Sequence, residues 1–470
     1  MLVGHFLSTQ MKIKLGRNIT LVAALIFWVT LVLRIRGIGD HFWLLDDQIR
    51  DWSIALGSFS ELPLVGPLTH FGGYTIGPAF YWILWAIRVT VGPWFQNLPH
   101  AGGIGQAMLQ SGADALLLAA IWRRTRSPWI ALSTTVLVSM AAYDLALSAL
   151  VWNPTMGSAL AKIAMALVLL DWHRGALVRV ALTAAVAWSA VHAYTGAIFI
   201  CISVFAAILA EPIAQWNWSG ARRAGAVIVM VVVLLQAPYI AHRLSGQFDV
   251  RAMGGVSDSV GLILSGDEQP AIANSVASYV DAVHFIAVEP WHIPFFGWIL
   301  VACAGIVAVR YRRDYSLLAM TLLPQAAAVT GYSLFIGDLN HYYYLSLMPA
   351  AILMFVLAAT ALPPPRFVVP TAILILVIAL ALTPGRLRFA TTMHQMPQYR
   401  LLVEGSRQIK NVGQPIKAIE TDFVLPGTTD PEFLYTILGG RIDPQSPLIA
   451  LITGDGRIVY RKVGDRDAGF

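Results

Sequence analysis

Residues 44–52 read Leu-Leu-Asp-Asp-Gln-Ile-Arg-Asp-Trp, which places three carboxylates and one arginine together in a chain that is only 12% charged. The stretch follows closely on the first apolar run of the chain, residues 19–36. Charged side chains near a bilayer cost free energy, and they are kept there mostly where they bind or react with something. We therefore expect the other segments to build a cavity around this stretch.

The composition outside this stretch is that of a membrane protein. Of 470 residues, 57% are hydrophobic, and the mean hydropathy is +0.66. A soluble protein would carry roughly 25% charged residues. Apolar runs near 20 residues recur, long enough to span a hydrocarbon core of about 30 Å. The runs are residues 19–36, 74–95, 101–122, 127–149, 155–171, 177–192, 194–211, 224–240, 293–309, 315–336, 343–362 and 367–384. We predict an all-α polytopic membrane protein with about 11–12 hydrophobic helices.

Basic clusters alternate with polar loops of other chemistry. The clusters lie at residues 12–17, 123–126, 174–179, 222–223, 310–313 and at Arg366. Because Lys and Arg are enriched in cytoplasmic loops, these clusters and the N-terminus (1–18) are expected inside. Three runs separate residues 12–17 from 123–126, although an even number of crossings is required. Glycine, proline and Arg88 interrupt the run 74–95, so we predict that this run is interfacial, re-entrant or half-length.

The domain organisation follows from these runs. A transmembrane domain covers residues 19–384, with outer loops 37–73 and 241–292, the second holding one or two surface-lying amphipathic helices. Residues 385–470 are polar and predict a small extracytoplasmic α/β domain, with a strand at 416–421, a helix at 431–438 and a hairpin at 448–462. Cys201 and Cys303 fall inside apolar runs, so no disulfide framework is expected.

The acidic stretch admits two interpretations on its own residues. Asp46 and Asp47 could divide the work of a reaction, one as general base and the other as orienting group or metal ligand. Alternatively, Asp46, Asp47, Arg50 and Asp51 form one solvated face of an amphipathic helix at the membrane surface. The residues alone leave both interpretations open.

The surrounding motifs resemble those of a known superfamily. Residues 33–37 (Leu-Arg-Ile-Arg-Gly), followed by Phe42-Trp43 and Asp46-Asp47, resemble the opening of the GT-C polyprenyl-phosphate sugar transferases. That superfamily includes protein O-mannosyltransferases, the lipid A aminoarabinose transferase and rhizobial lipopolysaccharide galacturonosyltransferases. Residues 77–82 (Gly-Pro-Ala-Phe-Tyr-Trp) resemble the start of its second segment. One departure concerns Ile76, which stands where the aminoarabinose transferases have a lysine; His70 or Arg88 could supply that cation instead.

The resemblance implies inverting transfer of a sugar from a polyprenyl-phosphate carrier to a glycan, lipid or protein acceptor. The reaction is expected on the extracytoplasmic face of a bacterial inner membrane. Asp46 is the expected catalytic base, and Asp47 is expected to support it. No cofactor is assigned, and a divalent cation on the carboxylates stays open.

Further candidate site residues are cationic, aromatic and amide side chains near the predicted ends of the helices. Arg243 and Arg251 are the first candidates for the donor phosphate, because a guanidinium bonds two phosphate oxygens at once. His192 and His341 are further phosphate candidates, although each is also explained as a packed core or interfacial residue. The expected substrate-binding residues are Arg50, His70, Tyr74, Tyr81, Asn153, Tyr194 and Tyr342. Asn153 equally fits a simple helix break before Pro154.

Several alternatives are excluded or left open by the sequence. No Walker-type loop or Rossmann fingerprint is found, which argues against a nucleotide-sugar donor, and no basic stripe with exposed aromatics suggests nucleic-acid binding. No His/Cys cluster has zinc-site spacing. An O-antigen ligase or polymerase type of enzyme with a lipid pyrophosphate donor stays open, because it would depend on arginines. A transporter or flippase for lipid-linked sugars would predict pseudo-symmetric halves.

Overall fold

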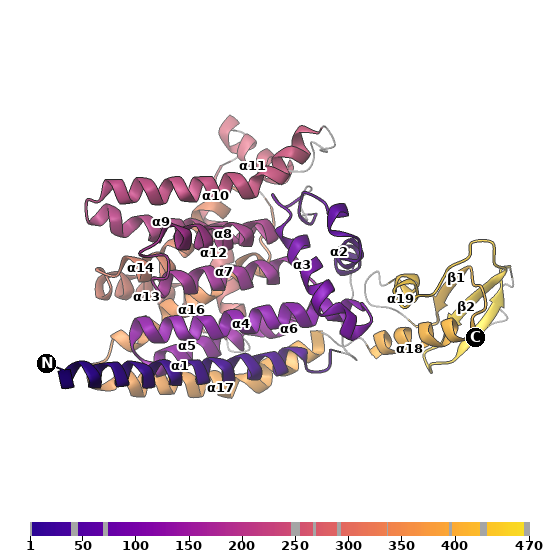
Figure 1. Ribbon diagram of the computed structural model, residues 1–470, viewed down its shortest axis with the longest axis horizontal. Coiled ribbons are helices and arrows are strands. Elements are labelled where there is room, and N and C mark those ends of the chain that lie inside the picture. The colour runs from indigo at the N-terminus through magenta and orange to yellow at the C-terminus, as the bar shows by residue number, and fades with distance from the viewer. Residues whose placement is uncertain are drawn as a thin grey trace.

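The computed structural model describes residues 2–38, 46–68, 74–245, 254–266, 269–288, 293–335, 337–393, 397–423 and 430–464. The first ten helices are α1 (Leu2–Ile35), α2 (Asp46–Leu56), α3 (Ala79–Thr90), α4 (Pro99–Thr125), α5 (Pro128–Ser139), α6 (Ala142–Leu147), α7 (Asn153–Leu169), α8 (Leu177–Ala193), α9 (Ile198–Ala214) and α10 (Trp218–Leu244). They are followed by α11 (Gly254–Ser265), α12 (Ile272–Val288), α13 (Phe296–Arg310), α14 (Tyr315–Thr321), α15 (Leu323–Tyr332), the 3-10 helix η5 (His341–Leu347), α16 (Met348–Ala361) and α17 (Val368–Met393). The chain ends with α18 (Pro397–Val412), β1 (Ala418–Thr421), α19 (Pro431–Ile437), β2 (Leu448–Ile452) and β3 (Ile458–Lys462) (Figure 1).

Long helices run side by side along the longest axis of the molecule (Figure 1). Among the described residues, six stretches are long and apolar enough to cross a membrane: Asn18–Ile35, Pro99–Thr125, Thr195–Ala214, Trp218–Leu244, His341–Ala361 and Pro365–Met393. Four shorter apolar helices accompany them: α3, α5, α8 and α13. The prediction of an all-α polytopic membrane protein with a small C-terminal α/β unit is confirmed. Helix α3 has 12 residues, about 18 Å at 1.5 Å per residue, which is too short for a full crossing.

The basic loops that are distant in sequence meet at one end of the bundle, here called the basic end (residues 123–126, 171–174 and 310–314). Arg124 donates to Asp171 at 2.6 Å and also pairs with Asp314. Arg174 pairs with Asp171 at 3.2 Å and with Glu211 at 2.8 Å. Since these loops share one end, they share one side of the membrane, as the distribution of Lys and Arg predicts.

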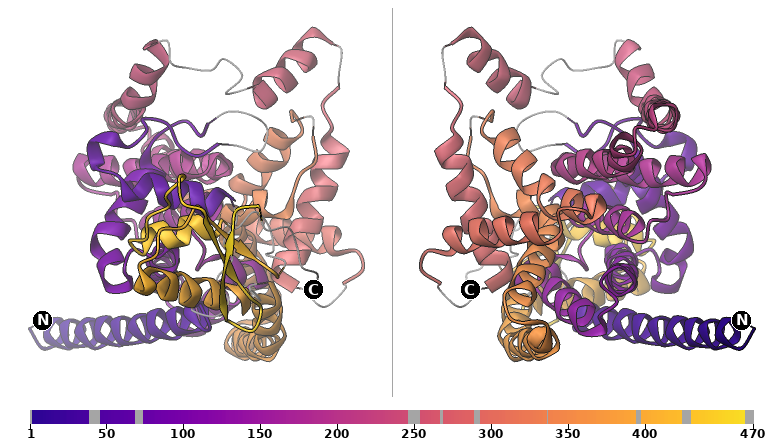
Figure 2. Two further views of the ribbon diagram at one scale, coloured as in Figure 1. Left: turned by 90° about the vertical axis from the view of Figure 1, so that its right-hand side faces the viewer. Right: turned by 90° about the vertical axis from the view of Figure 1, so that its left-hand side faces the viewer.

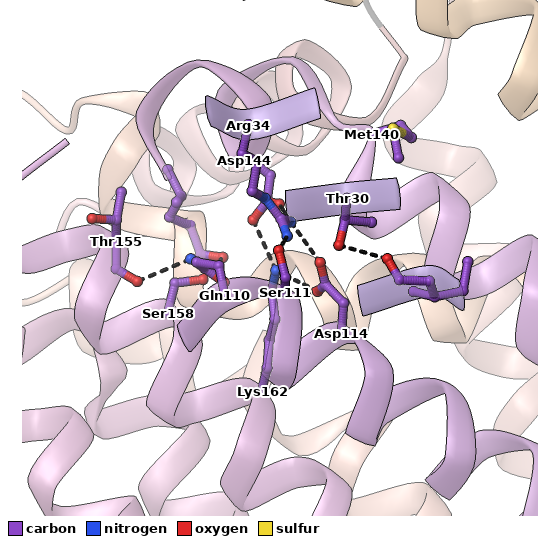
Figure 3. A network of polar contacts seen from close by, with 12 residues as sticks. Thr30, Arg34, Gln110, Ser111, Asp114, Met140, Asp144, Thr155, Ser158 and Lys162 are labelled. Atoms are coloured by element: carbon purple, nitrogen blue, oxygen red, sulfur yellow. Dashed lines mark hydrogen bonds and ion pairs between the residues drawn. The ribbon is translucent and has the colours of Figure 1, made fainter. Parts of the chain in front are cut away.

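A cluster of four charged side chains lies inside the bundle (Figure 3). Arg34 of α1 pairs with Asp114 of α4 at 2.5 Å and with Asp144 of α6. Lys162 of α7 lies 2.8 Å from each of the same two carboxylates. Arg34 also donates to the Ser111 hydroxyl at 2.8 Å. Two cations and two anions, from four helices, therefore neutralise one another away from water.

Burial makes this four-charge cluster a strong constraint on the packing of α1, α4, α6 and α7. The Asp144 side chain is 7% exposed and the other three are at most 1% exposed. Transferring an unpaired ion into the interior costs several kcal/mol, so each charge requires both of its partners. Asp144 is a charge within the apolar run 127–149, which from the sequence makes it a candidate ligand. The structure places it in this cluster instead.

The segment predicted as the outer loop 241–292 contains two helices, α11 and α12, among its described residues. Helix α12 differs from the surface-lying helices expected there, because it packs into the bundle. Tyr279, Ala282, Val283 and Ile286 are buried in the main core, and Tyr279 donates to Gln325 at 2.7 Å. The spacing of these residues gives one continuous apolar face, which docks on neighbouring helices rather than on lipid.

Helix α17 continues through Pro384 to Met393, past the boundary expected at residue 385. Arg386, 1% exposed, donates to the carbonyl of Met140 at 3.3 Å and to that of Ala287. These carbonyls lie at the ends of α5 and α12, where helix dipoles favour a cation. Arg386 therefore belongs to the bundle rather than to the polar tail.

The C-terminal unit has the elements that the sequence predicted. Strand β1 pairs with β2 in parallel, and β2 pairs with β3 as an antiparallel hairpin. The unit packs against the bundle at the start of α4, where Leu98 joins its core and His100 lies 3.2 Å from the Tyr399 hydroxyl. Figure 2 shows this unit in front of the bundle when the molecule is viewed from the end that carries α2.

Thiol labelling in whole cells tests the sidedness that the basic loops predict. Arg312→Cys and Gly454→Cys place exposed thiols at the basic end and in the C-terminal hairpin. A membrane-impermeant reagent is expected to label position 454 but not 312, because basic loops stay in the cytoplasm. Background should be low, since Cys201 and Cys303 are buried. Labelling at 312 without labelling at 454 would reverse the topology.

Substitution of Lys162 tests the four-charge cluster. Lys162→Met leaves two buried carboxylates facing one guanidinium, and the expected loss of stability is about 3–5 kcal/mol. The double variant Lys162→Met/Asp114→Asn restores neutrality and should recover much of this loss. Removing an exposed pair with Arg400→Met is the control and should cost under about 1 kcal/mol. Thermal unfolding in detergent measures all three; equal effects of Lys162→Met and Arg400→Met would contradict the assignment.

Candidate active site around helix α2

Helix α2 is fixed against the bundle by Trp52. This indole is fully buried, and its Nε1 donates to the carbonyl of Asn97 at 2.7 Å. It packs so closely on Gly102 of α4 that a Cβ there would lie 2.5 Å from the ring and from Val151. A glycine is therefore needed at position 102, and the acidic stretch is held over the start of α4.

Asp51 is the buried carboxylate of the stretch, with 1% of the residue exposed. Its Oδ1 accepts from the Tyr81 hydroxyl at 2.9 Å and from Arg50 Nε at 2.9 Å. Its Oδ2 is buried and makes no hydrogen bond to the described residues. Burial raises the pKa of Asp51 to about 6, although Arg50 and Tyr81 act in the opposite direction. A carboxyl that titrates near neutrality is thus built into α2.

Asp47 and Asp51 share Arg50 as their common cation. Arg50 Nη1 lies 2.9 Å from Asp47 Oδ1, and Asp47 is half-exposed. Asp46 is the first residue of α2, a position where the helix dipole favours a carboxylate. The side chain of Asp46 lies outside the described part of the chain, and so do His70 and Arg251. The described geometry therefore covers the surroundings of the expected base rather than the base itself.

A second group of polar contacts holds the segment that leads into α3. Gln236 of α10 donates to the carbonyl of Ile76 at 2.6 Å and lies 3.2 Å from Nε2 of His192. The His192 ring occupies the space beside Gly77, where a Cβ would lie 2.2 Å from it. His192 is 1% exposed. The structure thus supports its interpretation as a packed, hydrogen-bonded residue that positions residues 76–77.

Arg88 and Tyr74 also contact this region through the backbone. Arg88 donates to the carbonyl of Leu56 at 2.7 Å, the last residue of α2. In the structure this guanidinium therefore holds the end of α2. Tyr74 is half-buried and forms an isolated bridge with Leu68.

An aromatic wall, consisting of Trp152, Tyr194, Tyr332, Tyr342 and Tyr343, lines the next part of this end. Trp152 and Tyr342 rings lie 5.0 Å apart, and Tyr342 contacts Tyr343 edge-to-face at 4.6 Å. Tyr332 donates to the carbonyl of Tyr343 at 3.0 Å, and Tyr194 is buried beside Gly196. Aromatic rings arranged in this way are rigid and present large apolar faces.

Gln106 of α4 joins the aromatic wall to the acidic stretch. Its side chain bonds both the backbone N–H and the carbonyl of Trp152 at 3.0 Å, just before α7 begins at Asn153. The preceding Val151 and Trp52 of α2 both lie against Gly102 of α4. Asn153 itself is half-buried, and no described hydrogen bond from its side chain is present. Two groups of expected site residues thus meet through residues 151–152.

The remaining expected phosphate ligands lie at two separate places. His341 Nε2 lies 2.7 Å from Asp281 Oδ2, and its ring stacks on Phe285 at 4.7 Å. Arg243 is exposed in the last turn of α10. Within the described residues, no group of three or more His, Cys, Asp or Glu side chains could hold a metal ion.

Sequence reasoning missed Asp51, Gln236 and Gln106 as important members of this end. Asp51 was visible as a third carboxylate, but its burial depends on Tyr81 of α3. Gln236 lies in an apolar run, and a polar residue there is the one signal that could have drawn attention to it.

Comparison with known proteins identifies the fold. No protein-family model matches the chain, and no curated protein matches it. Among solved structures, the chain is similar to ArnT from Cupriavidus metallidurans bound to undecaprenyl phosphate, with a TM-score of 0.51 and 13% identity, over 91% of this chain and 85% of that chain. The apo state of that protein gives a TM-score of 0.45 and 15% identity, over 92% and 86%. The likeness to the first structure establishes an ArnT-like fold, as the GT-C resemblance predicted.

The dependence of stability on pH tests the buried state of Asp51. Its native pKa of about 6 lies above the ordinary value of 3.8, so the folded protein binds this proton more tightly than the unfolded chain. The contribution of Asp51 to stability is therefore largest below pH 4 and falls by about 3 kcal/mol as pH rises past 6. Asp51→Asn should remove this fall. Thermal unfolding of both proteins between pH 3.5 and 7 measures it, and parallel curves would contradict the buried carboxyl.

Proposed function

We propose that this protein is a membrane glycosyltransferase that moves a sugar from a polyprenyl-phosphate carrier to an acceptor hydroxyl with inversion at the anomeric carbon. The observation that carries the proposal is the acidic stretch held against α4 and α3 within an ArnT-like fold. Carboxylates of this kind at a bundle end are functional by default in a membrane protein. The ArnT structure with undecaprenyl phosphate supports a lipid phosphate as the donor carrier.

Asp46 is the proposed base. It accepts the proton of the acceptor hydroxyl as the alcohol attacks the anomeric carbon opposite the departing phosphate. Asp47 supports it, and Arg50 holds Asp47 at 2.9 Å so that the first turn of α2 keeps one arrangement. The phosphate is an adequate leaving group, so the step needs no covalent intermediate with the protein.

The donor phosphate requires a cation, because an unpaired anion at the membrane boundary is costly. Arg243 is our first choice, since it is exposed at the end of α10 and can bond two oxygens at once. His192 and His341 rank lower, because an imidazole is charged only when it is protonated, whereas a guanidinium stays charged. Trp152 and Tyr342, the half-buried rings of the aromatic wall, supply apolar faces against which a sugar ring or acceptor can pack.

Substitution at α2 tests the assignment of the base. Asp46→Asn is expected to lower turnover of polyprenyl-phosphate sugars by about 10²–10⁴, the usual cost of losing a general base. Donor binding and thermal unfolding should stay unchanged, because the amide keeps the size of the carboxylate. Rates are measured in proteoliposomes with a panel of donor sugars.

Asp47→Asn is the matched control for this experiment, and it should lower turnover less. An inactive Asp47→Asn beside a normal Asp46→Asn would transfer the role of base to Asp47. Normal turnover in both variants, with a donor that the wild type uses, would contradict the mechanism.

A further inference from the structure

The basic end of the bundle is hollowed by a cavity of about 980 Å³. Four separate segments line it: the end of α4 with Arg124, the loop before α8 with Arg174, the end of α9, and residues 309–315. It lies at the opposite end of the molecule from α2. The cavity is therefore separate from the proposed site of glycosyl transfer, and its function does not depend on that reaction.

The charges around the cavity do not balance. Five arginines line it, and Asp314, Glu211 and the adjacent Asp171 are the carboxylates, so five positive charges minus three negative charges leave +2. All three carboxylates form ion pairs with Arg124 or Arg174.

The excess positive charge lies on the loop after α13. Arg310, Arg312 and Arg313 line the cavity and are exposed. Within the described ranges, none of the three makes an ion pair. A guanidinium of this kind can bond two oxygens of one phosphate group, so the three side chains offer a binding surface for an anion.

Exposed aromatic residues place the cavity at the level of lipid headgroups. Trp216 is 78% exposed and Trp218 is 51% exposed, directly after Gln215, which lines the cavity. Tryptophan is enriched at the membrane–water interface. Val309 at the rim is 75% exposed, and Val301 on the same helix is 62% exposed, so an apolar surface continues from the cavity along α13.

We propose that this cavity binds the headgroup of an anionic phospholipid. The phosphate contacts Arg310, Arg312 and Arg313, and the acyl chains lie along the apolar face of α13. Basic pockets between membrane helices bind anionic headgroups in this way. Arg124 and Arg174, which are already ion-paired, shape the cavity wall rather than contact the lipid.

Arginines in a cytoplasmic loop are also explained by the bias of such loops toward positive charge, which sets the orientation of the protein in the membrane. That explanation requires only the charge of the side chains. A headgroup site additionally requires the guanidinium fork and the position on the cavity wall. Lysine in place of arginine retains the charge and loses the bidentate geometry. The two explanations therefore differ in what a charge-conserving substitution does.

Native mass spectrometry of the full chain in neutral detergent tests the proposal, with phosphatidylglycerol or phosphatidylcholine added. The wild type should retain phosphatidylglycerol in preference to phosphatidylcholine. The triple variant Arg310→Gln/Arg312→Gln/Arg313→Gln should lose about a hundredfold in phosphatidylglycerol affinity, at about fivefold for each interfacial cation. The triple variant with lysine keeps the charge and should show a smaller loss of affinity. It also serves as the test if the glutamine variant folds poorly.

The matched control is Arg222→Gln/Arg223→Gln on α10, two exposed arginines that do not line the cavity. This variant should bind phosphatidylglycerol as the wild type does. Equal losses in the control and the cavity variants, or equal binding of the two lipids by the wild type, would overturn the proposal. Inorganic phosphate at millimolar concentration should not displace the lipid; displacement would assign the cavity to a free anion instead.

Discussion

The four-charge cluster of Arg34, Asp114, Asp144 and Lys162 is the interaction on which the rest of the structure depends. Each ion has lost its water, and each is stable there only because two opposite charges replace that water. Because the ions come from α1, α4, α6 and α7, a shift of any one helix would leave a buried charge without a partner. The cluster thus specifies one packing of these helices, where apolar contacts alone would tolerate several.

The candidate site is built on two of the same helices. Helix α4 contributes Gly102, which receives Trp52, and Gln106, which holds the backbone before α7. Helix α7 begins directly after Trp152, the ring that contacts Tyr342. The acidic stretch is therefore supported by the elements that the buried ions fix.

The two ends of the bundle carry opposite excesses of charge. At the α2 end, Arg50 pairs with both Asp47 and Asp51, and burial raises the pKa of Asp51 to about 6. At the basic end, carboxylates such as Asp314 lie among several arginines and also cap helices, since Asp314 accepts from the N–H of Leu317 at 3.0 Å. One end is thus suited to accept protons and the other to accept anions.

Helix α18 (Pro397–Val412) was not predicted from the sequence. The class of fold, most of the apolar helices, and the strands and short helix of the C-terminal unit were. These follow from local properties: the length of an apolar run, the position of Gly and Pro, and alternation in a strand. The short length of α3 could also be predicted, because Gly77, Pro78 and Pro93 bound it. Only the tertiary structure decided which polar residues are buried together. Asp144 looked like a ligand and is an ion-pair partner, Arg88 looked like a donor cation and binds the end of α2, and Asp51 is buried by Tyr81. These outcomes depend on residues 30 to more than 100 positions away in the chain, and no local pattern in the sequence encodes such distances.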